Sequence, residues 1–139
     1  MLVRDLMSAE VVTLERGETL DIADRIMSLG RIRHMPVVDA DGRLCGLVSQ
    51  RDLFRGALAR AIGLARSAQD RLLGALLVQD VMTAEPFTTT PETPLGEAAA
   101  LMLLRKIGCL PVVDADRRLV GIITEADFVA HVASLNASR

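Results

Sequence analysis

Two short stretches contain the residues whose types and spacing are best suited to chemistry. Ser49 and Asp52 are spaced as hydroxyl-x-x-carboxylate, and Thr124 and Asp127 repeat that spacing. The local explanation is a helix capping box, in which the hydroxyl accepts a backbone N–H and the acid reaches back. In the functional explanation the hydroxyl and the helix N–H groups bind a phosphate. The carboxylate then accepts hydrogen bonds from two ribose hydroxyls, and the sequence keeps both explanations open.

A phosphate also requires a cation. Arg33 and His34 stand directly before the first Met-Pro-Val-Val segment, whereas Gly108 and Cys109 occupy the corresponding positions before the second, with Arg105 further back. The alternatives to a phosphate-binding role are that Arg33 is a solvated surface charge and that His34 is a partly buried polar residue. The two halves therefore differ in the charge that they offer an anion.

Other chemistries find little support in the sequence. The two histidines, His34 and His131, belong to no nucleophile–base–acid constellation. Cys45 and Cys109 are far apart and lack the spacing of zinc ligands, so we expect reduced structural thiols. We predict no enzyme activity, no catalytic cofactor and no metal.

Composition narrows the class of partner. Aromatic residues make up 2% of the 139 residues, which leaves few stacking platforms for single-stranded nucleic acid. A formal charge of −2 gives no attraction for a polyanion, so nucleic acid is not an expected partner. No apolar run reaches the 18 or so residues of a membrane span. We expect a cytoplasmic protein with no membrane partner. Its core should be aliphatic and include Met7, Met27, Met82 and Met102.

The chain contains an internal repeat at a fixed offset of 75 residues. Residues 3–53 and 78–128 align without a gap and are identical at 21 of 51 positions. The shared segments are an opening Val-x-Asp-x-Met, a Pro-Val-Val-Asp-Ala-Asp stretch, and Gly-aliphatic-aliphatic-Ser/Thr-x-x-Asp. A period of this length indicates duplication of a whole structural unit rather than a solenoid.

Each copy predicts the same elements. A helix opens near Thr19 in the first copy, and in the second it follows Thr93 as N-cap with Pro94 at the first helical position. An apolar strand with a proline, the turn residues Asp39–Gly42 and a second strand, residues 44–48, then form a hairpin. Another helix starts at Ser49. The alanine- and leucine-rich residues 56–77 favour helix with a break near 63–69.

The three segments, in order and twice, resemble the CBS domain, a motif named after cystathionine β-synthase that occurs in pairs. The likeness covers residues 2 to about 131. It implies a mixed α/β (α+β) fold of two β-α-β-β-α motifs packed with pseudo-two-fold symmetry. The domains expected are residues 1–60 and 78–139, joined by a helical linker at 61–77.

The resemblance also implies a ligand. In nucleotide-binding members, residues matching Asp52 and Asp127 contact ribose, those matching Ser49 and Thr124 lie by the ribose-phosphate, and basic residues near position 34 meet the phosphate. By that pattern His34 serves the Asp52 cleft, and Arg33 reaches across to the Asp127 cleft. Val12 and Phe87 lie on the segment that lines the adenine, with plain core as their alternative.

The function that this resemblance implies is regulatory. We expect clefts between the motifs to bind an adenine nucleotide (AMP, ADP, ATP or a related adenosyl molecule), whose level is transmitted to an effector protein. A homodimer, as a disk of four motifs, is the expected assembly. The alternative is a dimerisation or docking module that binds no small molecule.

Overall fold

A computed structural model of the chain describes residues 1–54, 71 and 73–137. The fold divides into two compact units. The continuous unit comprises Val12–Glu85, and the discontinuous unit combines Met1–Val11 with Pro86–Arg139. Most of the predicted linker at 61–77, including its expected break, lies outside the described residues.

The secondary structure follows the repeat. In chain order the elements are η1 (Val3–Asp5), α1 (Leu20–Gly30), β1 (His34–Val38), β2 (Leu44–Ser49), α4 (Val78–Val81), β3 (Thr83–Ala84), α5 (Leu95–Arg105), β4 (Cys109–Val113), β5 (Leu119–Thr124) and α6 (Glu125–Ala137). Residues 50–54 are also helical. The predicted mixed fold is confirmed, and the helices predicted to start near Thr19, at Pro94 and at Ser49 start one residue later. Pro94, rather than Thr93, is the N-cap of α5, because Pro94 keeps extended backbone angles.

Both predicted hairpins are present with the same register. In the first, β1 pairs antiparallel with β2, so that His34 faces Ser49. In the second, β4 pairs with β5, so that Cys109 faces Thr124. The first strand expected in each motif is very short. In the continuous unit it is β3, which pairs with Gly46 and Leu47, and in the discontinuous unit it is a single bridge between Ser8 and Ile122.

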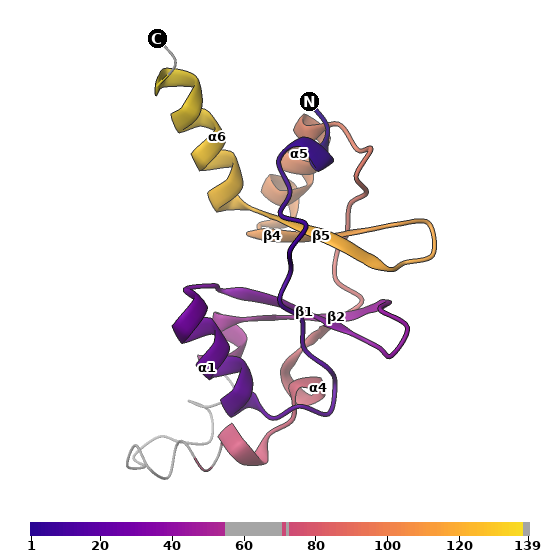
Figure 1. The fold of residues 1–139 in the computed structure, drawn as a ribbon, viewed down its shortest axis with the longest axis vertical. Coiled ribbons are helices and arrows are strands. Elements are labelled where there is room, and N and C mark those ends of the chain that lie inside the picture. Colours follow the sequence, from indigo (N-terminus) through magenta and orange to yellow (C-terminus); the bar gives the residue numbers. More distant parts are fainter. Residues whose placement is uncertain (55–70, 72, 138–139) are drawn as a thin grey trace. The chain divides into compact units, whose positions relative to one another are not determined.

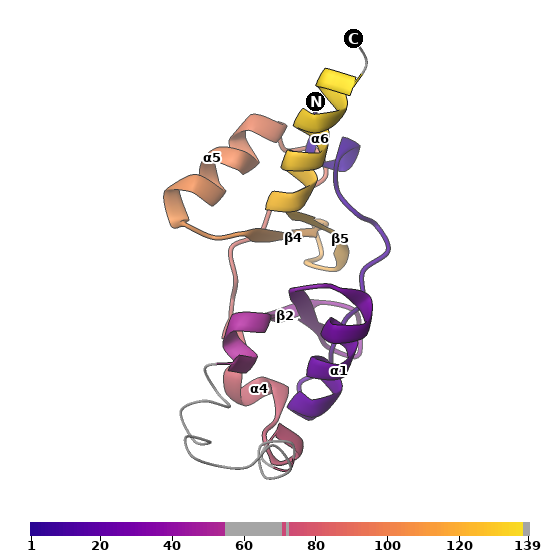
Figure 2. The same cartoon turned by 90° about the vertical axis from the view of Figure 1, so that its left-hand side faces the viewer.

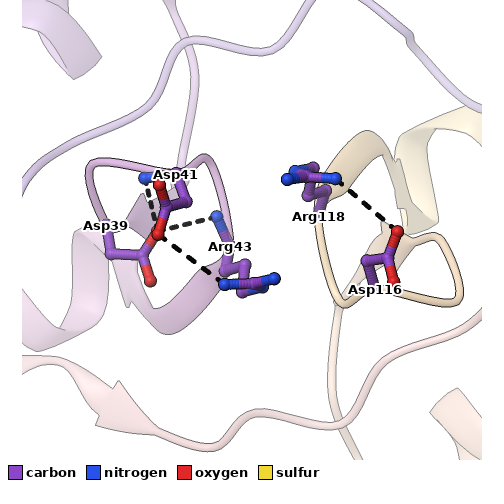
Figure 3. Close-up of polar contacts among 5 residues, drawn as sticks. All are labelled: Asp39, Asp41, Arg43, Asp116 and Arg118. Atoms are coloured by element: carbon purple, nitrogen blue, oxygen red, sulfur yellow. Dashed lines mark hydrogen bonds and ion pairs between the residues drawn. The ribbon is translucent and has the colours of Figure 1, made fainter.

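Aspartates close the two hairpin turns. Asp39 Oδ1 accepts the N–H groups of Asp41 and Arg43, each at 2.9 Å. Asp114 does the same in the second hairpin. Ion pairs at 3.6 Å, Arg43–Asp41 and Arg118–Asp116, join residues within each turn and are solvent-exposed (Figure 3). Their exposure to water limits what they contribute to stability.

The continuous unit has an aliphatic core beneath its hairpin. Helices α1 and α4 lie on the same face of β1 and β2 (Figures 1 and 2). The apolar stripe of α1 packs there, and the core residues are Leu14, Leu20, Ala23, Met27, Met35, Val37, Val48, Leu53, Leu76 and Val78. Val78 belongs to the second repeat by sequence, yet it is fully buried in this unit.

The discontinuous unit is built in the same way. Helices α5 and α6 lie on one face of β4 and β5 (Figures 1 and 2). The buried residues are Val3, Ala98, Met102, Leu110, Val112 and Ile123. Val3, from the first repeat, is fully buried here. The opening segments of the repeats are therefore exchanged between the units, and the compact units do not coincide with the repeats.

The three fixed residues of the opening Val-x-Asp-x-Met motif each have a structural role. Val3 enters the core of the discontinuous unit, while Asp5 accepts the backbone N–H of Leu2 at 2.7 Å and so caps the short helical turn. Met7 lies against Gly121, where an added Cβ would stand 2.7 Å from the Met7 sulfur. Val78, Asp80 and Met82 repeat these roles in the continuous unit, with Met82 against Gly46. The prediction that methionines fill the core is confirmed: Met27 and Met102 are buried in the two cores, and Met82 and Met7 are partly buried against them.

Candidate functional site

The end of β2 carries a complete capping box. The Ser49 N–H donates to Asp52 Oδ2 at 2.8 Å, and the Asp52 N–H donates to Ser49 Oγ at 3.1 Å. The local explanation for this pair is thus confirmed. The cap uses only one carboxylate oxygen, however, and Asp52 Oδ1 has no hydrogen bond within the described part of the chain. That oxygen is available to accept a bond from a ligand hydroxyl.

The end of β5 carries a variant of the same arrangement. The Thr124 N–H donates to Asp127 Oδ2 at 2.8 Å, as in the first repeat. The Thr124 hydroxyl donates to the same oxygen at 3.3 Å instead of accepting the Asp127 N–H. Both bonds converge on Oδ2, so Asp127 Oδ1 lacks a hydrogen-bond partner among the described residues. Both carboxylates are half-buried and held in place by the first turn of a helix.

Strand pairing brings the residues before β1 and β4 to the same ends. His34 pairs with Ser49, and the Gln50 N–H donates to the Arg33 carbonyl at 2.8 Å. In the continuous unit the structure therefore brings together Arg33, His34, Ser49 and Asp52. In the discontinuous unit Cys109 pairs with Thr124, and the Glu125 N–H donates to the Gly108 carbonyl at 3.0 Å.

Val12 and Phe87 lie beside these ends as well. The segment that follows Val12 runs parallel to β1, with the Leu14 N–H bonded to the Pro36 carbonyl at 2.9 Å. Thr89 bonds to Pro111 in the same way at 3.0 Å. Two residues earlier in each segment, Val12 is 50% exposed and Phe87 47% exposed. The core alternative for these two side chains is therefore wrong, because each presents apolar surface at the end of its sheet.

The two ends differ in charge. Arg33 is exposed and has no ion pair within residues 1–54, 71 and 73–137, so its guanidinium keeps its donors for an anion. At the other end, the Glu125 carboxylate lies 3.5 Å from where a Gly108 Cβ would stand. Burial raises the pKa of the Cys109 thiol to about 12, and the negative charge of Asp127 adds to the rise. Cys109 is therefore a neutral thiol. This end has no counterpart of Arg33, and it has one additional carboxylate, because Glu125 stands where the first repeat has Gln50.

Sequence reasoning noted Arg105 in the second repeat but gave it no role. Arg105 lies over the Phe87 ring, with its guanidinium carbon 4.8 Å from the ring centroid. Alignment of the repeats puts Arg105 opposite Gly30 rather than opposite Arg33. A comparison position by position could not find it. The signal in the sequence was the displaced basic residue at the end of a predicted helix, three positions before Gly108.

Metal-binding clusters and membrane-spanning helices are both absent from the described residues. No group of three or more histidine, cysteine, aspartate or glutamate side chains there could hold a metal ion. In the same part of the chain, no helix combines the length and the apolar character needed to cross a bilayer.

Comparison with known proteins identifies the family. The family model of the CBS domain matches residues 3–59 and again residues 78–134. The chain belongs to the CBS domain family. It carries two CBS domains in tandem, as the internal repeat predicts, and the resemblance drawn from the three segments is confirmed.

Relatives align along nearly the whole pair of CBS domains. A CBS domain-containing protein of Dictyostelium discoideum is 37% identical over 131 residues, which cover 93% of this chain and 89% of that protein. The CBS domain pair of protein MJ0100, solved with 5′-methylthioadenosine and S-adenosyl-L-methionine, has a TM-score of 0.81 at 28% identity and covers 96% of this chain and 97% of that chain. CBSX2 of Arabidopsis thaliana, solved with AMP, has a TM-score of 0.79 at 30% identity and covers 99% and 98%.

Some relatives with CBS domains are much longer enzymes. A homoserine O-acetyltransferase of Methanohalobium evestigatum is 31% identical over 125 residues, which cover 90% of this chain. The same residues cover only 23% of the acetyltransferase. The likeness is therefore confined to a CBS region of that enzyme.

Proposed function

We propose that this CBS pair is a regulatory module that binds an adenine nucleotide or a related adenosyl ligand and catalyses no reaction. The observation that carries the proposal is the recurrence of one constellation in both units. Each has a carboxylate fixed by the first turn of a helix, an adjacent hydroxyl and an exposed apolar side chain. Similar pairs solved with AMP and with S-adenosyl-L-methionine support an adenosyl ligand.

Each part of the constellation matches one part of a nucleotide. The free Oδ1 of Asp52 or Asp127 accepts hydrogen bonds from ribose hydroxyls, while Oδ2 stays bonded to the helix start. Hydrogen bonds to a charged acceptor are about twice as strong as neutral ones. Val12 or Phe87 provides apolar surface for the flat base. The N–H groups at the start of the helix favour a phosphate.

Arg33 adds a positive charge in the continuous unit, so we propose that this end binds the more anionic ligands. The sequence also predicts that Arg33 serves the Asp127 site, and this assignment stays a prediction. Arg33→Ala should weaken nucleotide binding by roughly tenfold at the site that Arg33 contacts. Calorimetry on Asp52→Asn and Asp127→Asn backgrounds identifies that site. Equal losses on both backgrounds would exclude a single assignment.

Substitution of Asp127 by Asn tests the central proposal, since Asn caps a helix about as well as Asp. The melting temperature of the free protein should stay nearly unchanged. A ribose acceptor, in contrast, loses about 1.5–3 kcal/mol per charged hydrogen bond, or roughly tenfold or more in affinity. Calorimetry with AMP and with its 2′,3′-dideoxy analogue measures both effects. Normal binding by the variant, or equal binding of the analogue and AMP by the wild type, would show that Asp127 is only a cap.

A module that binds no small molecule is the alternative function. The capping bonds of Asp52 and Asp127 are the observation in its favour, because they give both carboxylates a structural role. A thermal-shift screen separates the two functions. A ligand present at 100 times its dissociation constant stabilises the folded protein by about 2.7 kcal/mol. The screen should include AMP, ADP, ATP and S-adenosyl-L-methionine, and no shift with any of them would favour the docking module.

We also propose that the chain forms a homodimer and passes ligand occupancy to an effector protein. Helices α5 and α6 expose large apolar side chains, with Leu103 81% and Val129 69% exposed. Exposed large apolar side chains on a helix are often buried at interfaces. Light scattering at micromolar concentration should give twice the 15.0 kDa chain mass. A Leu103→Glu variant should shift the protein to the monomer, whereas a wild-type monomer would contradict the proposal.

A further inference from the structure

Arg105 occupies the last turn of α5, at the same end of the discontinuous unit as Thr124 and Asp127. Helix α5 ends at Lys106, whose left-handed backbone turns the chain toward β4. Phe87 immediately precedes the residues that run parallel to β4. Cys109, the first residue of β4, faces Thr124. The end of α5, the Phe87 ring and the Thr124–Asp127 pair therefore all lie toward the start of β4, at one end of the sheet.

The Arg105 side chain is oriented but not neutralised. The guanidinium carbon lies 4.8 Å from the centroid of the Phe87 ring, a cation–π contact that does not engage the N–H donors in conventional hydrogen bonds. Among the described residues Arg105 makes no ion pair and no side-chain hydrogen bond. Its five donors are thus available for a planar or tetrahedral anion. The ring contact restricts the long side chain before any ligand arrives, which lowers the entropy cost of binding.

The need for a cation is specific to this unit. Gly108 and Cys109 stand where the other repeat has Arg33 and His34, and the carboxylates of Glu125 and Asp127 lie nearby. A phosphate at the start of α6 would meet two negative charges and no compensating positive charge from positions 108 and 109. Arg105 is the charge of the right sign, and it comes from the same unit.

We propose that Arg105, held on the Phe87 ring, binds the phosphate of a nucleotide at the Asp127 site and so sets the preference of that site for phosphorylated over uncharged adenosyl ligands. The inference rests on the proposed nucleotide-binding function and adds a residue to it. The Asp127 site then has its own cation, without Arg33. The continuous unit cannot use the same device, because Gly30 stands at the equivalent position.

Calorimetry with AMP and with adenosine tests the role of Arg105, because the two ligands differ only in the phosphate. The Asp52→Asn background reports the Asp127 site, and the Asp127→Asn background is the internal control. On the first background Arg105→Gln should weaken AMP binding roughly tenfold and leave adenosine binding within about twofold. Arg105→Lys should fall between, because lysine keeps the charge but loses the planar donors. On the second background Arg105→Gln should change neither affinity.

Arg4→Gln is a matched control for the loss of one positive charge. Arg4 is exposed in the same unit and lies near the beginning of α5, since its N–H bonds to Pro91. Eleven residues of α5 separate the two ends by roughly 15 Å. This variant should bind AMP like the wild type.

The outcomes separate the inference from the function on which it rests. Failure of the wild type to bind AMP and adenosine would overturn both. Wild-type binding of AMP with no selective loss in Arg105→Gln would overturn the role of Arg105 alone. Equal losses of AMP and adenosine would also overturn it, because they indicate a role in folding or in the base wall rather than in phosphate binding.

Discussion

Gly121 lies where the opening segment of the chain crosses β5, and its replacement by Ala tests the exchange of segments between the units. A Cβ at this position would stand 2.7 Å from Met7 Sδ, 3.2 Å from Met7 Cγ and 2.9 Å from the Ser8 carbonyl oxygen. The sulfur is at the far end of a flexible side chain and can move. The carbonyl oxygen cannot move freely, because Ser8 and Ile122 exchange two backbone hydrogen bonds of 2.9 Å.

The magnitude follows from these contacts. Overpacking of a tight site costs about 1–3 kcal/mol. Loss of the two Ser8–Ile122 bonds adds about 0.5–1.5 kcal/mol each. The reduced freedom of Ala in the unfolded chain offsets about 0.4–1 kcal/mol. Together these terms predict that Gly121→Ala lowers the free energy of unfolding by about 1–6 kcal/mol, which lowers the melting temperature by roughly 3 °C or more for a chain of this length.

Thermal and urea unfolding, followed by circular dichroism, measure the change. Gly96→Ala is the matched control: an added Cβ there has nothing within 4 Å, and Gly96 lies inside α5. Ala is favoured over Gly in a helix by about 0.8–1.0 kcal/mol, so this variant should be more stable than the wild type. Gly46→Ala should cost less than Gly121→Ala, because the nearest backbone atom, the Thr83 carbonyl oxygen, is 3.2 Å away.

Double variants distinguish the two glycines further. Met82→Ala should relieve most of the cost of Gly46→Ala, whereas Met7→Ala should relieve only part of the cost of Gly121→Ala, where the Ser8 carbonyl remains. Truncation of a methionine has its own effect on stability, which a double-mutant cycle subtracts. The coupling energy that remains measures how far the truncation relieves the clash with the added Cβ. A Gly121→Ala variant as stable as Gly96→Ala would refute the close approach of the opening segment to β5. Complete rescue by Met7→Ala would refute the part assigned to Ser8.

Further predictions concern two buried polar groups. Thr89 Oγ1 is a buried side-chain oxygen without a hydrogen-bond partner among the described residues, so Thr89→Val should raise the free energy of unfolding by about 1–3 kcal/mol. Thr88→Val is the control, and chemical denaturation should show a change in its free energy of unfolding within about 0.5 kcal/mol. If Thr89→Val were no more stable than the wild type, the Thr89 hydroxyl would have a hydrogen-bond partner. Burial raises the pKa of Cys109 from 9.0 to about 12, so the unfolded chain loses this proton first. The stability from Cys109 is present below pH 9 and is lost as the pH rises toward 12. Urea unfolding should show this decline in the wild type but not in Cys109→Ala, and Cys45 should react with thiol reagents first; equal slopes would contradict the pKa shift.

Local pattern was sufficient for the elements of the fold. The apolar spacing after Thr19 predicted α1, and Asp39–Gly42 predicted the turn between β1 and β2. These features depend on neighbours a few residues apart, so the sequence contains the information that they need. The repeat reinforced it, because each prediction in one copy was repeated 75 residues later.

The candidate site was predicted in part. The sequence identified Ser49 with Asp52 and Thr124 with Asp127, and the cap bonds confirm that these pairs are in contact. The sequence did not decide whether Val12 and Phe87 lie in the core or at the surface, because an apolar residue in an extended segment is compatible with both. Exposure of about half of each side chain decides for the surface.

What the sequence by itself determined is that the chain is a tandem repeat with two hydroxyl-carboxylate pairs, since the motifs are local and occur twice. Only the tertiary structure decided which unit each opening segment joins. Val3 and Val78 have the same local sequence around them, and both hairpins present a glycine against which Met7 or Met82 could pack. Local interactions are therefore nearly equal for the two pairings. The choice depends on contacts between residues far apart in the chain, as does the contact between Arg105 and Phe87, and no local pattern records them.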